Sequence, residues 1–282
     1  MTPLFLAFSL AVAPGVQALV DHAESLRRAG RLDEAQRALD AGAPALAKAA
    51  SETDRLRLRF AHARITYYRG TLTGAPHDAV IAELRDIVAA AAPLADAALL
   101  ADARDHLGLA VYLRDFGATD QAEPRALFEQ ALAVRRAAND GRAVAESLFH
   151  LALTFENKKD PTEADKARAR ALHGEALAVA EAGGFDVEAS YPVRHLAGHK
   201  QDAGDLDGAL ADFERSLALR EKAGYAIYLA PSLMAVGDVW KDKGDAAKAR
   251  AQYERAGIEA DRIGAARFRT MADEAAAALK TR

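Results

Sequence analysis

The sequence predicts an all-α protein built from repeated helical hairpins, and three observations indicate this. Residues 192–256 contain one pattern twice: a pair of small or apolar residues, a glycine seven positions later, and an aromatic residue nine positions after the glycine. The two aromatic residues, Phe213 and Tyr253, define a period of 40 residues, which is typical of stacked two-helix units. Hydrophobic residues make up 51% of the chain but aromatic residues only 6%, so much of the apolar content is alanine, which favours close helix packing over a sheet.

Within one unit the spacing predicts two antiparallel helices joined by a short turn. Apolar and small residues recur at steps of three and four, which places them on one face of each helix. Gly204 suits the left-handed backbone at a helix C-terminus, and Asp205 can cap the helix that follows. Ala197 and Ala209 let the two backbones approach, and Phe213 fills the space between them. Each hairpin leaves an apolar face uncovered, so it needs a neighbour on both sides.

This pattern resembles the tetratricopeptide repeat. The spacing is longer than the standard one and, with phrases such as FERSLALREKAG, is similar to the long-period form of kinesin light chains and bacterial signalling proteins. The proline that this family usually has near the end of the second helix is absent, and Ala223-Gly224 ends the unit instead. The residues that carry the resemblance are Leu196, Ala197, Gly204, Ala209, Phe213 and Ser216, with their counterparts Val236, Gly237, Gly244, Ala249, Tyr253 and Ala256.

Four earlier hairpins precede this pair, and each keeps part of the pattern. The first has the turn AGRLDEA, a close relative of AGDLDGA in the fifth. The second has the weakest pattern, and the third and fourth have stretched turns, DFGATDQAEP and NKKDPTEAD. The residues that occupy the positions of this pattern are, hairpin by hairpin, Ala23, Gly30, Ala35 and Leu39; Phe60, Ala61, Ile65 and Tyr68; Leu109, Ala110 and Phe128; and Leu151, Ala152 and His173. The resemblance thus implies a right-handed α-solenoid of about six hairpins.

We expect a last amphipathic helix over about residues 266–280, with Phe268, Met271, Ala275 and Leu279 on one side. A solenoid needs an end cap with a polar outer face, and this helix is the natural candidate. No linker or low-complexity segment interrupts the array, so we predict that residues 19–282 form one domain.

Residues 1–18, MTPLFLAFSLAVAPGVQA, have the features of a signal peptide cleaved after Ala18. An apolar run too short to span a bilayer is followed by helix breakers and by small residues at Val16 and Ala18. This predicts a periplasmic or secreted protein with no membrane span in the mature chain. The alternative is a cytoplasmic protein in which this segment is an apolar helix packed on the first repeat.

Composition excludes several classes of function. The formal net charge is −4, whereas nucleic-acid binders usually carry a basic excess, so no nucleic-acid partner is expected. The chain has no cysteine, which excludes disulfides, thiolate nucleophiles and cysteine-ligated zinc. It has neither a G-x-S-x-G motif nor a glycine-rich phosphate loop. We therefore expect no cofactor and no enzymatic activity.

The resemblance implies that the first helix of each hairpin lines a concave groove. The positions carried over to this chain are rich in arginine and aromatic residues: Arg27, Arg57, Phe60, Arg64, Tyr67, Arg104, Arg114, Phe149, Asn157, Tyr191 and Arg194. Arginine binds carboxylates with two hydrogen bonds, and aromatic residues anchor apolar side chains. We predict a non-catalytic interaction scaffold that binds an acidic peptide or a partner domain. The alternatives are a regulatory module that closes on a peptide signal, and a solvated face whose arginines pair with nearby Asp and Glu.

Two histidines raise the question of a metal site. His195 and His199 lie four residues apart, with Asp202 three further on, so one helix face could present all three to zinc. This spacing lacks the glutamate of the H-E-x-x-H motif, and a metal-dependent enzyme using His195 and His199 stays the less favoured alternative. His173, in an aromatic position, is expected to lie in the core.

Two further features are expected to be structural. Trp240 is expected in the core. Residues 205–214 imitate part of a calcium loop, but Ala203 occupies the first ligand position and has no side-chain oxygen. We therefore interpret Asp205 as part of a turn and helix start.

Overall fold

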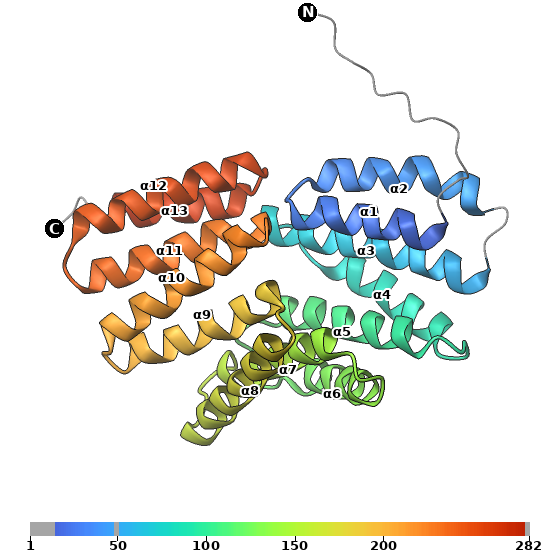
Figure 1. Ribbon diagram of the computed structural model, residues 1–282, viewed down its shortest axis with the longest axis horizontal. Helices are drawn as coiled ribbons and strands as arrows, with labels where there is room; N and C mark the ends of the chain where they lie inside the picture. The colour runs from blue at the N-terminus through green and yellow to red at the C-terminus, as the bar shows by residue number, and fades with distance from the viewer. Residues whose placement is uncertain (1–14, 48–50, 280–282) are drawn as a thin grey trace, which may run out of the picture.

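A computed structural model describes residues 15–47 and 51–279 of the chain. These residues form thirteen α-helices and one short 3-10 helix, and no strand occurs among them. The prediction of an all-α solenoid of six hairpins with a capping helix is confirmed (Figure 1).

The hairpins follow one another along the chain without interruption. They are α1 (Val16–Arg28) with α2 (Leu32–Ala47), α3 (Glu52–Thr73) with α4 (Asp78–Ala91), α5 (Ala97–Arg114) with α6 (Ala122–Ala137), α7 (Gly141–Glu156) with α8 (Glu163–Ala182), α9 (Asp186–Asp202) with α10 (Leu206–Lys222), and α11 (Leu229–Asp242) with α12 (Ala246–Arg262). The 3-10 helix η1 (Ala226–Tyr228) precedes α11, and α13 (Ala266–Ala278) is the capping helix.

The short turns form as the glycine and aspartate pattern predicts. Gly204 and Gly244 adopt φ values of 82° and 81°, in the left-handed region that glycine tolerates best. Asp205 accepts a hydrogen bond from the backbone N–H of Gly208 at 2.9 Å, which caps α10. Asp205 therefore serves as a helix cap, in agreement with its interpretation as a turn residue.

An aromatic ring from the second helix fills the middle of a hairpin where the first helix has a glycine. A Cβ atom added at Gly237 would lie 2.6 Å from the ring of Tyr253, and one added at Gly108 would lie 2.6 Å from the ring of Phe128. In the third hairpin the residue under the ring is therefore Gly108, not the predicted pair Leu109-Ala110. The shift arises because the turn between α5 and α6 is longer than the turn between α9 and α10.

The array curves until its two ends meet (Figure 1). Helix α13 contacts α3, and η1 contacts α1. Arg28 Nη2 of α1 also lies 3.6 Å from Glu188 Oε1 of α9, in the fifth hairpin. A Cβ atom added at Gly30 would lie 2.4 Å from Cγ2 of Ile263. The capping helix therefore covers α12 and also touches the second hairpin.

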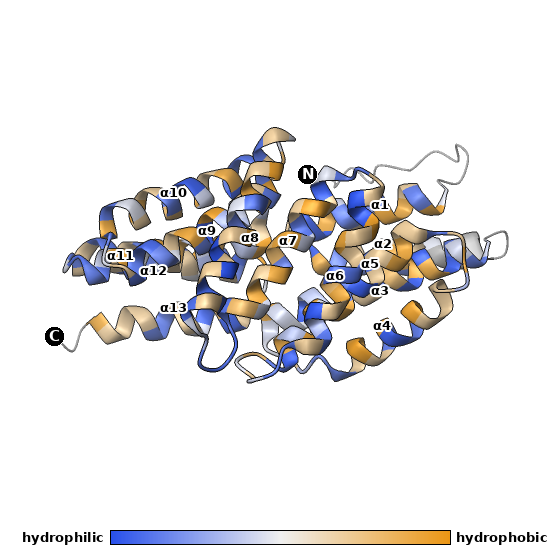
Figure 2. Cartoon of the chain, turned by 90° about the horizontal axis from the view of Figure 1, so that it is seen from below, coloured by the Kyte–Doolittle hydropathy of each residue, from blue (hydrophilic) through white to orange (hydrophobic). Residues whose placement is uncertain are grey.

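Each hairpin combines apolar and polar residues on its helices, as a stacked array of amphipathic units requires (Figure 2). Within the described residues, no helix has the length and apolar character needed to cross a membrane.

The first helix starts close to the predicted cleavage site. Val16 is the first residue of α1 and is buried. Cleavage after Ala18 would remove the first three residues of this helix, whereas residues 1–14 lie outside the described residues. The signal peptide stays a prediction.

Candidate functional site

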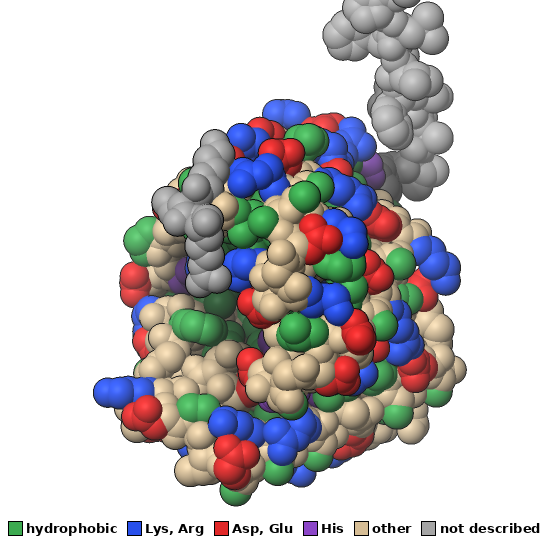
Figure 3. Space-filling view, turned by 90° about the vertical axis from the view of Figure 1, so that its left-hand side faces the viewer, with side chains coloured by type: hydrophobic (Ala, Val, Ile, Leu, Met, Phe, Trp, Pro, Cys, Tyr) green, Lys and Arg blue, Asp and Glu red, His purple; other side chains and the backbone are tan. Residues whose placement is uncertain are grey.

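A cavity of about 370 Å³ lies inside the curved array, and we call it the central cavity. It is lined from α3, α5, α7, α9, α10, α11 and α13, together with η1. Two large hydrophobic side chains that line it, Phe116 and Met271, are 63% and 40% exposed and form an apolar rim. On the end of the molecule formed by the last repeats, Figure 3 shows a hollow with hydrophobic side chains inside it.

Aromatic rings form much of the cavity wall. The rings of Phe149 and Tyr191 stack with their centroids 4.8 Å apart. The hydroxyl of Tyr191 is hydrogen-bonded to that of Tyr225 at 2.6 Å. Tyr67 and Tyr68, from α3, meet edge to face at 5.0 Å. Rings held by packing and by hydrogen bonds lose little freedom when a ligand binds, so this wall is suited to apolar side chains.

Arg220 of α10 is the most unusual charged residue of the cavity, since it is 2% exposed and has no carboxylate partner among the described residues. Its Nε donates to Ser190 Oγ at 3.0 Å, and its Nη1 donates to Ser232 Oγ at 2.5 Å and to the carbonyl of Tyr228 at 3.1 Å. Its guanidinium lies 4.9 Å from the centre of the Tyr191 ring. The buried guanidinium of Arg220 is therefore held by uncharged groups, namely two serine hydroxyls, a backbone carbonyl and an aromatic ring.

The third hairpin provides an internal comparison for Arg220. Arg135 also follows the hairpin's aromatic residue by seven positions, and it donates to Ser147 Oγ, twelve residues later, at 2.6 Å. Three carboxylates surround Arg135: Asp102 at 2.7 Å, Asp105 at 3.0 Å and Glu146 at 3.5 Å. The third hairpin thus neutralises its buried arginine, whereas the fifth does not.

The pKa values of these arginines reflect this difference. Burial disfavours the charge on Arg135, but Asp105, Glu146 and Asp102 outweigh it and hold the pKa above its usual range. Burial lowers the pKa of Arg220, and only tyrosine side chains oppose that effect. Arg220 therefore carries an unfavourable buried charge that an anion would stabilise.

Arg194 of α9 lies on the same wall and also lacks a partner. It forms neither a hydrogen bond nor an ion pair with any residue that the structure describes. Burial, followed by the charge of Arg220, lowers its pKa to about 10, although the charges of Glu156 and Asp238 oppose this, so it stays charged at neutral pH. We call Arg194 and Arg220 the arginine pair. Two guanidiniums without an ion-pair partner in the described chain lie beside an aromatic wall, and guanidiniums have the geometry that suits a carboxylate.

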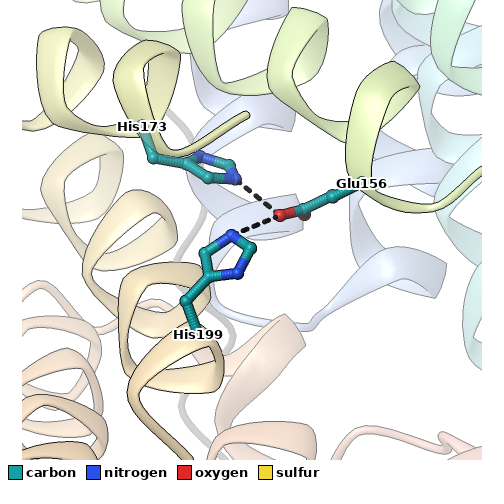
Figure 4. A group of neighbouring side chains, drawn as sticks. All are labelled: Glu156, His173 and His199. Atoms are coloured by element: carbon teal, nitrogen blue, oxygen red, sulfur yellow. Dashed lines mark hydrogen bonds and ion pairs between the residues drawn. The ribbon is translucent and has the colours of Figure 1, made fainter. Parts of the chain in front are cut away.

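A second cluster adjoins the central cavity at the end of α7. The carboxylate of Glu156 meets three histidines: His195 Nδ1 at 2.5 Å, His173 Nε2 at 3.1 Å and His199 Nε2 at 3.2 Å. Figure 4 shows Glu156, His173 and His199 pointing toward one another from different helices. Burial alone would raise the pKa of Glu156, but His195, His173 and His199 outweigh it and hold the pKa well below its usual range. Asp202, which the helix spacing grouped with two of these histidines, is not in this set of ligand atoms.

Solved structures with the same fold have very different sequences. A Rap protein complexed with competence and sporulation factor is 13% identical, with a TM-score of 0.63, over 91% of this chain and 79% of that chain. Aspartyl phosphate phosphatase F from Bacillus subtilis is 10% identical, with a TM-score of 0.58, over 95% of this chain and 80% of that chain. A signal transduction ATPase from Pyrococcus horikoshii with a tetratricopeptide repeat sensor is 13% identical, with a TM-score of 0.51, over 94% of this chain and 38% of that chain. No family model and no curated protein matches the sequence.

The fold is that of a tetratricopeptide-repeat solenoid. In this tetratricopeptide-repeat solenoid, five of the residues assigned to the predicted groove come together in the central cavity. They are Tyr67, Phe149, Asn157, Tyr191 and Arg194.

The arginines predicted for the front half of the groove pair with the protein's own carboxylates. Arg27 is buried and donates a hydrogen bond to Glu24. Glu24 also forms an ion pair with Arg64 at 3.1 Å. Arg57 pairs with Asp96 at 2.6 Å and Arg114 with Asp115 at 2.6 Å. For these four arginines the structure agrees with the alternative of internal ion pairing. Phe60 is buried in the core, and Arg104 is half-buried and does not line the central cavity.

Sequence reasoning missed the cavity residues that come from outside the first helices. Arg220 lies on a second helix, Tyr228 on η1, and Phe268 on the capping helix. The sequence did contain one signal for Arg220. The segments FERSLALR (213–220) and FEQALAVR (128–135) share a pattern that places Arg220 and Arg135 at equivalent positions of their hairpins.

The remaining single-residue expectations have mixed outcomes. His173 is fully buried, as expected, although it faces Glu156 instead of packing only on apolar neighbours. The expectation of a core Trp240 is wrong in part, since its ring is half-buried and Lys248 Nζ lies 3.9 Å from its centre. The ring therefore packs at the edge of the core and makes a cation–π contact with a lysine ammonium.

Proposed function

We propose that this tetratricopeptide-repeat solenoid is a non-catalytic regulatory module that binds a short peptide in its central cavity and holds a carboxylate of that peptide on the arginine pair. The observation that carries the proposal is the presence of two guanidiniums without carboxylate partners on an aromatic wall. This keeps the binding function expected from the sequence and narrows the expected partner, a peptide or a partner domain, to a peptide.

The size and shape of the central cavity support a peptide over a folded domain. Its volume of about 370 Å³ falls within the range of small-ligand sites, 300–1,000 Å³. Such a volume accommodates a few side chains. The apolar rim of Phe116 and Met271 offers further contact to the part of the peptide that leaves the cavity.

The charge of the site supports a carboxylate as the recognised group. A buried charge without a partner is unfavourable, and a carboxylate that forms hydrogen bonds with a guanidinium relieves this. Both the C-terminus of a peptide and an Asp or Glu side chain supply that chemistry. The neighbouring Phe149 and Tyr191 would then contact the adjacent apolar side chain.

The use of the same fold elsewhere is consistent with this proposal. The Rap protein named above was crystallised with competence and sporulation factor bound. At 13% identity the likeness concerns the fold alone, so the proposal depends on the residues of the central cavity.

Affinity selection from a library of random heptapeptides with free C-termini tests the proposal. We expect the wild-type protein to enrich peptides that combine a carboxylate with an aromatic or aliphatic side chain. Arg194→Gln should weaken their binding at least about 30-fold, since the loss of one partner of a buried charge pair costs about 2 kcal/mol or more. Arg168→Gln, a change of an exposed arginine on α8, is the matched control and should leave binding unchanged.

Selected peptides should then be compared with their C-terminally amidated forms. If amidation abolishes binding, the recognised group is the C-terminal carboxylate; if it does not, the group is an acidic side chain. Failure to enrich any sequence, or equal binding by wild type and Arg194→Gln, would contradict the proposed function.

A further inference from the structure

The cluster at the end of α7 has the composition of a metal site. Glu156 is the last residue of α7, His173 lies on α8 and His199 on α9, so three helices from two hairpins supply one carboxylate and two imidazoles (Figure 4). One carboxylate with two histidines is a ligand set that catalytic and regulatory zinc sites use. From this cluster we propose that Glu156, His173 and His199 bind a divalent transition-metal ion, with Zn²⁺ as the ion to be tested.

The distances between the ligand atoms fit a tetrahedral ion. Bonds of 2.0–2.2 Å to zinc place two ligands of a tetrahedron about 3.3–3.5 Å apart. Glu156 Oε2 lies 3.1 Å from His173 Nε2 and 3.2 Å from His199 Nε2. All three ligand atoms lie within 4.8 Å of one another. Small rotations of the side chains would therefore bring them to bonding distance of one ion.

Hydrogen bonding within the protein leaves this cluster incomplete. His199 Nε2 is buried and lies 3.2 Å from Glu156 Oε2, a contact at ion-pair distance without the geometry of a good hydrogen bond. His173 is fully buried, and its Nδ1 has no partner within the described residues. Buried polar atoms are normally paired, so an imidazole nitrogen that faces a carboxylate without bonding to it indicates a missing ligand.

The surroundings of the cluster leave room for the ion and for one more ligand. A pocket of about 550 Å³ is lined by Glu156, His195 and His199, and it can admit the ion together with a water molecule. His195 Nδ1 lies 2.5 Å from Oε1, the other oxygen of Glu156. A histidine in that place orients the carboxylate, as the outer partners of metal ligands usually do.

A second group of potential ligands in the described chain does not have these properties. Asp105, Glu146 and His150 also lie close together. Arg135 pairs with Asp105 at 3.0 Å and lies 3.5 Å from Glu146, so its charge already occupies the site that a cation would take. Within the described residues, no arginine or lysine forms an ion pair with Glu156, and Arg194 acts on it only through its charge, without a direct contact.

Metal titration of the purified full chain tests this proposal. The protein is treated with EDTA, dialysed, and titrated with ZnCl₂ by calorimetry and with CoCl₂ by visible spectroscopy. We expect one Zn²⁺ per chain, an increase in Tm on addition of Zn²⁺, and the visible d–d absorption of tetrahedral Co²⁺. Glu156→Gln and His199→Ala should each weaken Zn²⁺ binding by more than about tenfold, since even indirect partners of a metal contribute that much.

His22→Gln, a change of an exposed histidine on α1, is the matched control and should bind Zn²⁺ as the wild type does. Glu156→Gln retains a hydrogen-bond acceptor for His173, and circular dichroism without metal checks that both cluster variants are folded. Should either variant be unfolded, the Co²⁺ spectrum of the wild-type protein decides alone. No stoichiometric binding by the wild type, a Co²⁺ spectrum without tetrahedral absorption, or equal binding by folded cluster variants would overturn the metal site. None of these results depends on whether the central cavity binds a peptide.

Discussion

At the scale of single residues, the buried arginines of the third and fifth hairpins differ in the groups that surround their charge. Arg135 and Arg220 occupy the same place in their hairpins, yet carboxylates surround only Arg135. In the fifth hairpin, a serine oxygen and aromatic rings stand near the guanidinium instead. The carboxylates thus stabilise one hairpin, and their absence leaves the other able to attract an anion.

Asp105→Asn should destabilise the protein by about 3 kcal/mol, because it removes the one fully buried carboxylate that pairs with Arg135. Urea unfolding monitored by circular dichroism measures this. As a control, Asp33→Asn removes the exposed pair with Arg69 and should cost less than about 1 kcal/mol. Equal costs for the two variants would show that the buried pair has no special role.

His106 predicts a pH dependence of stability. It is 3% exposed, its ring meets that of Phe60 at 5.2 Å, and its Nε2 has no partner in the described chain. Burial, followed by the charge of Arg64, lowers its pKa well below the usual 6.5, although Asp105 opposes this. The folded state therefore binds fewer protons than the unfolded state, and stability falls as the pH drops below about 6.5.

Between pH 7.5 and 5.5 this histidine should contribute a loss of about 1.4 kcal/mol to the free energy of unfolding. Urea unfolding at both pH values measures the loss for the wild type and for His106→Leu. The variant should lose about 1.4 kcal/mol less than the wild type over the same range. The same pH dependence in both proteins would rule out His106 as its source.

At the scale of elements, an aromatic ring of the second helix packs against a glycine of the first helix, and this contact sets the distance between the two helices of a hairpin. Gly237→Ala should cost about 1–3 kcal/mol, because the new methyl group would lie 2.6 Å from the ring of Tyr253. Gly174→Ala on α8 meets open space and should be neutral or slightly stabilising. Thermal and urea unfolding compare the two. A neutral Gly237→Ala would mean that the hairpin can widen without cost.

The hairpins were predictable from the sequence because their signals are local. Turn glycines, capping aspartates and apolar steps of three and four all act within one hairpin, as at Gly204 and Asp205. The register of the third hairpin was not predictable in this way, since the long turn before α6 moves Gly108 under Phe128.

The candidate site was predictable only in part because it depends on contacts between distant hairpins. The expectation that the first helix of each hairpin lines the groove identified Tyr191 and Arg194. It could not show which arginines form ion pairs with carboxylates of the same chain. It also omitted Arg220, which enters the cavity from a second helix. The cluster around Glu156 was hidden for the same reason, since its members come from three helices.

At the scale of the whole molecule, the closure of the array depends on a small residue at the first turn. Gly30→Ala should cost about 1–3 kcal/mol more than Gly204→Ala. Both positions have positive φ, but only at Gly30 would the new Cβ atom meet Ile263, at 2.4 Å. The two variants therefore share the backbone strain and differ in the contact between the ends of the array.

Urea unfolding of Gly30→Ala, Ile263→Ala and the double variant measures this contact as a double-mutant cycle. The double variant should recover most of the extra cost, because the shortened side chain makes room for the methyl group. An absence of coupling would indicate that the ends of the array separate in solution.

Export of the protein can be tested directly at its N-terminus. If residues 1–18 are a signal peptide, the mature protein isolated from its native host begins at Leu19, and Edman degradation or mass spectrometry detects this. A chain that retains residues 1–18 would support the alternative, in which the segment stays attached to α1.

The meeting of α3 and α13 has a consequence for any ligand of the central cavity. Tyr67 from α3 and Phe268 and Met271 from α13 all line it, so one bound molecule would touch both ends of the superhelix at once. Ligand affinity and superhelical curvature are then thermodynamically linked. Any protein that binds the outer surface and prefers one curvature would change the affinity for the ligand, and the ligand would change the affinity for that protein by the same factor.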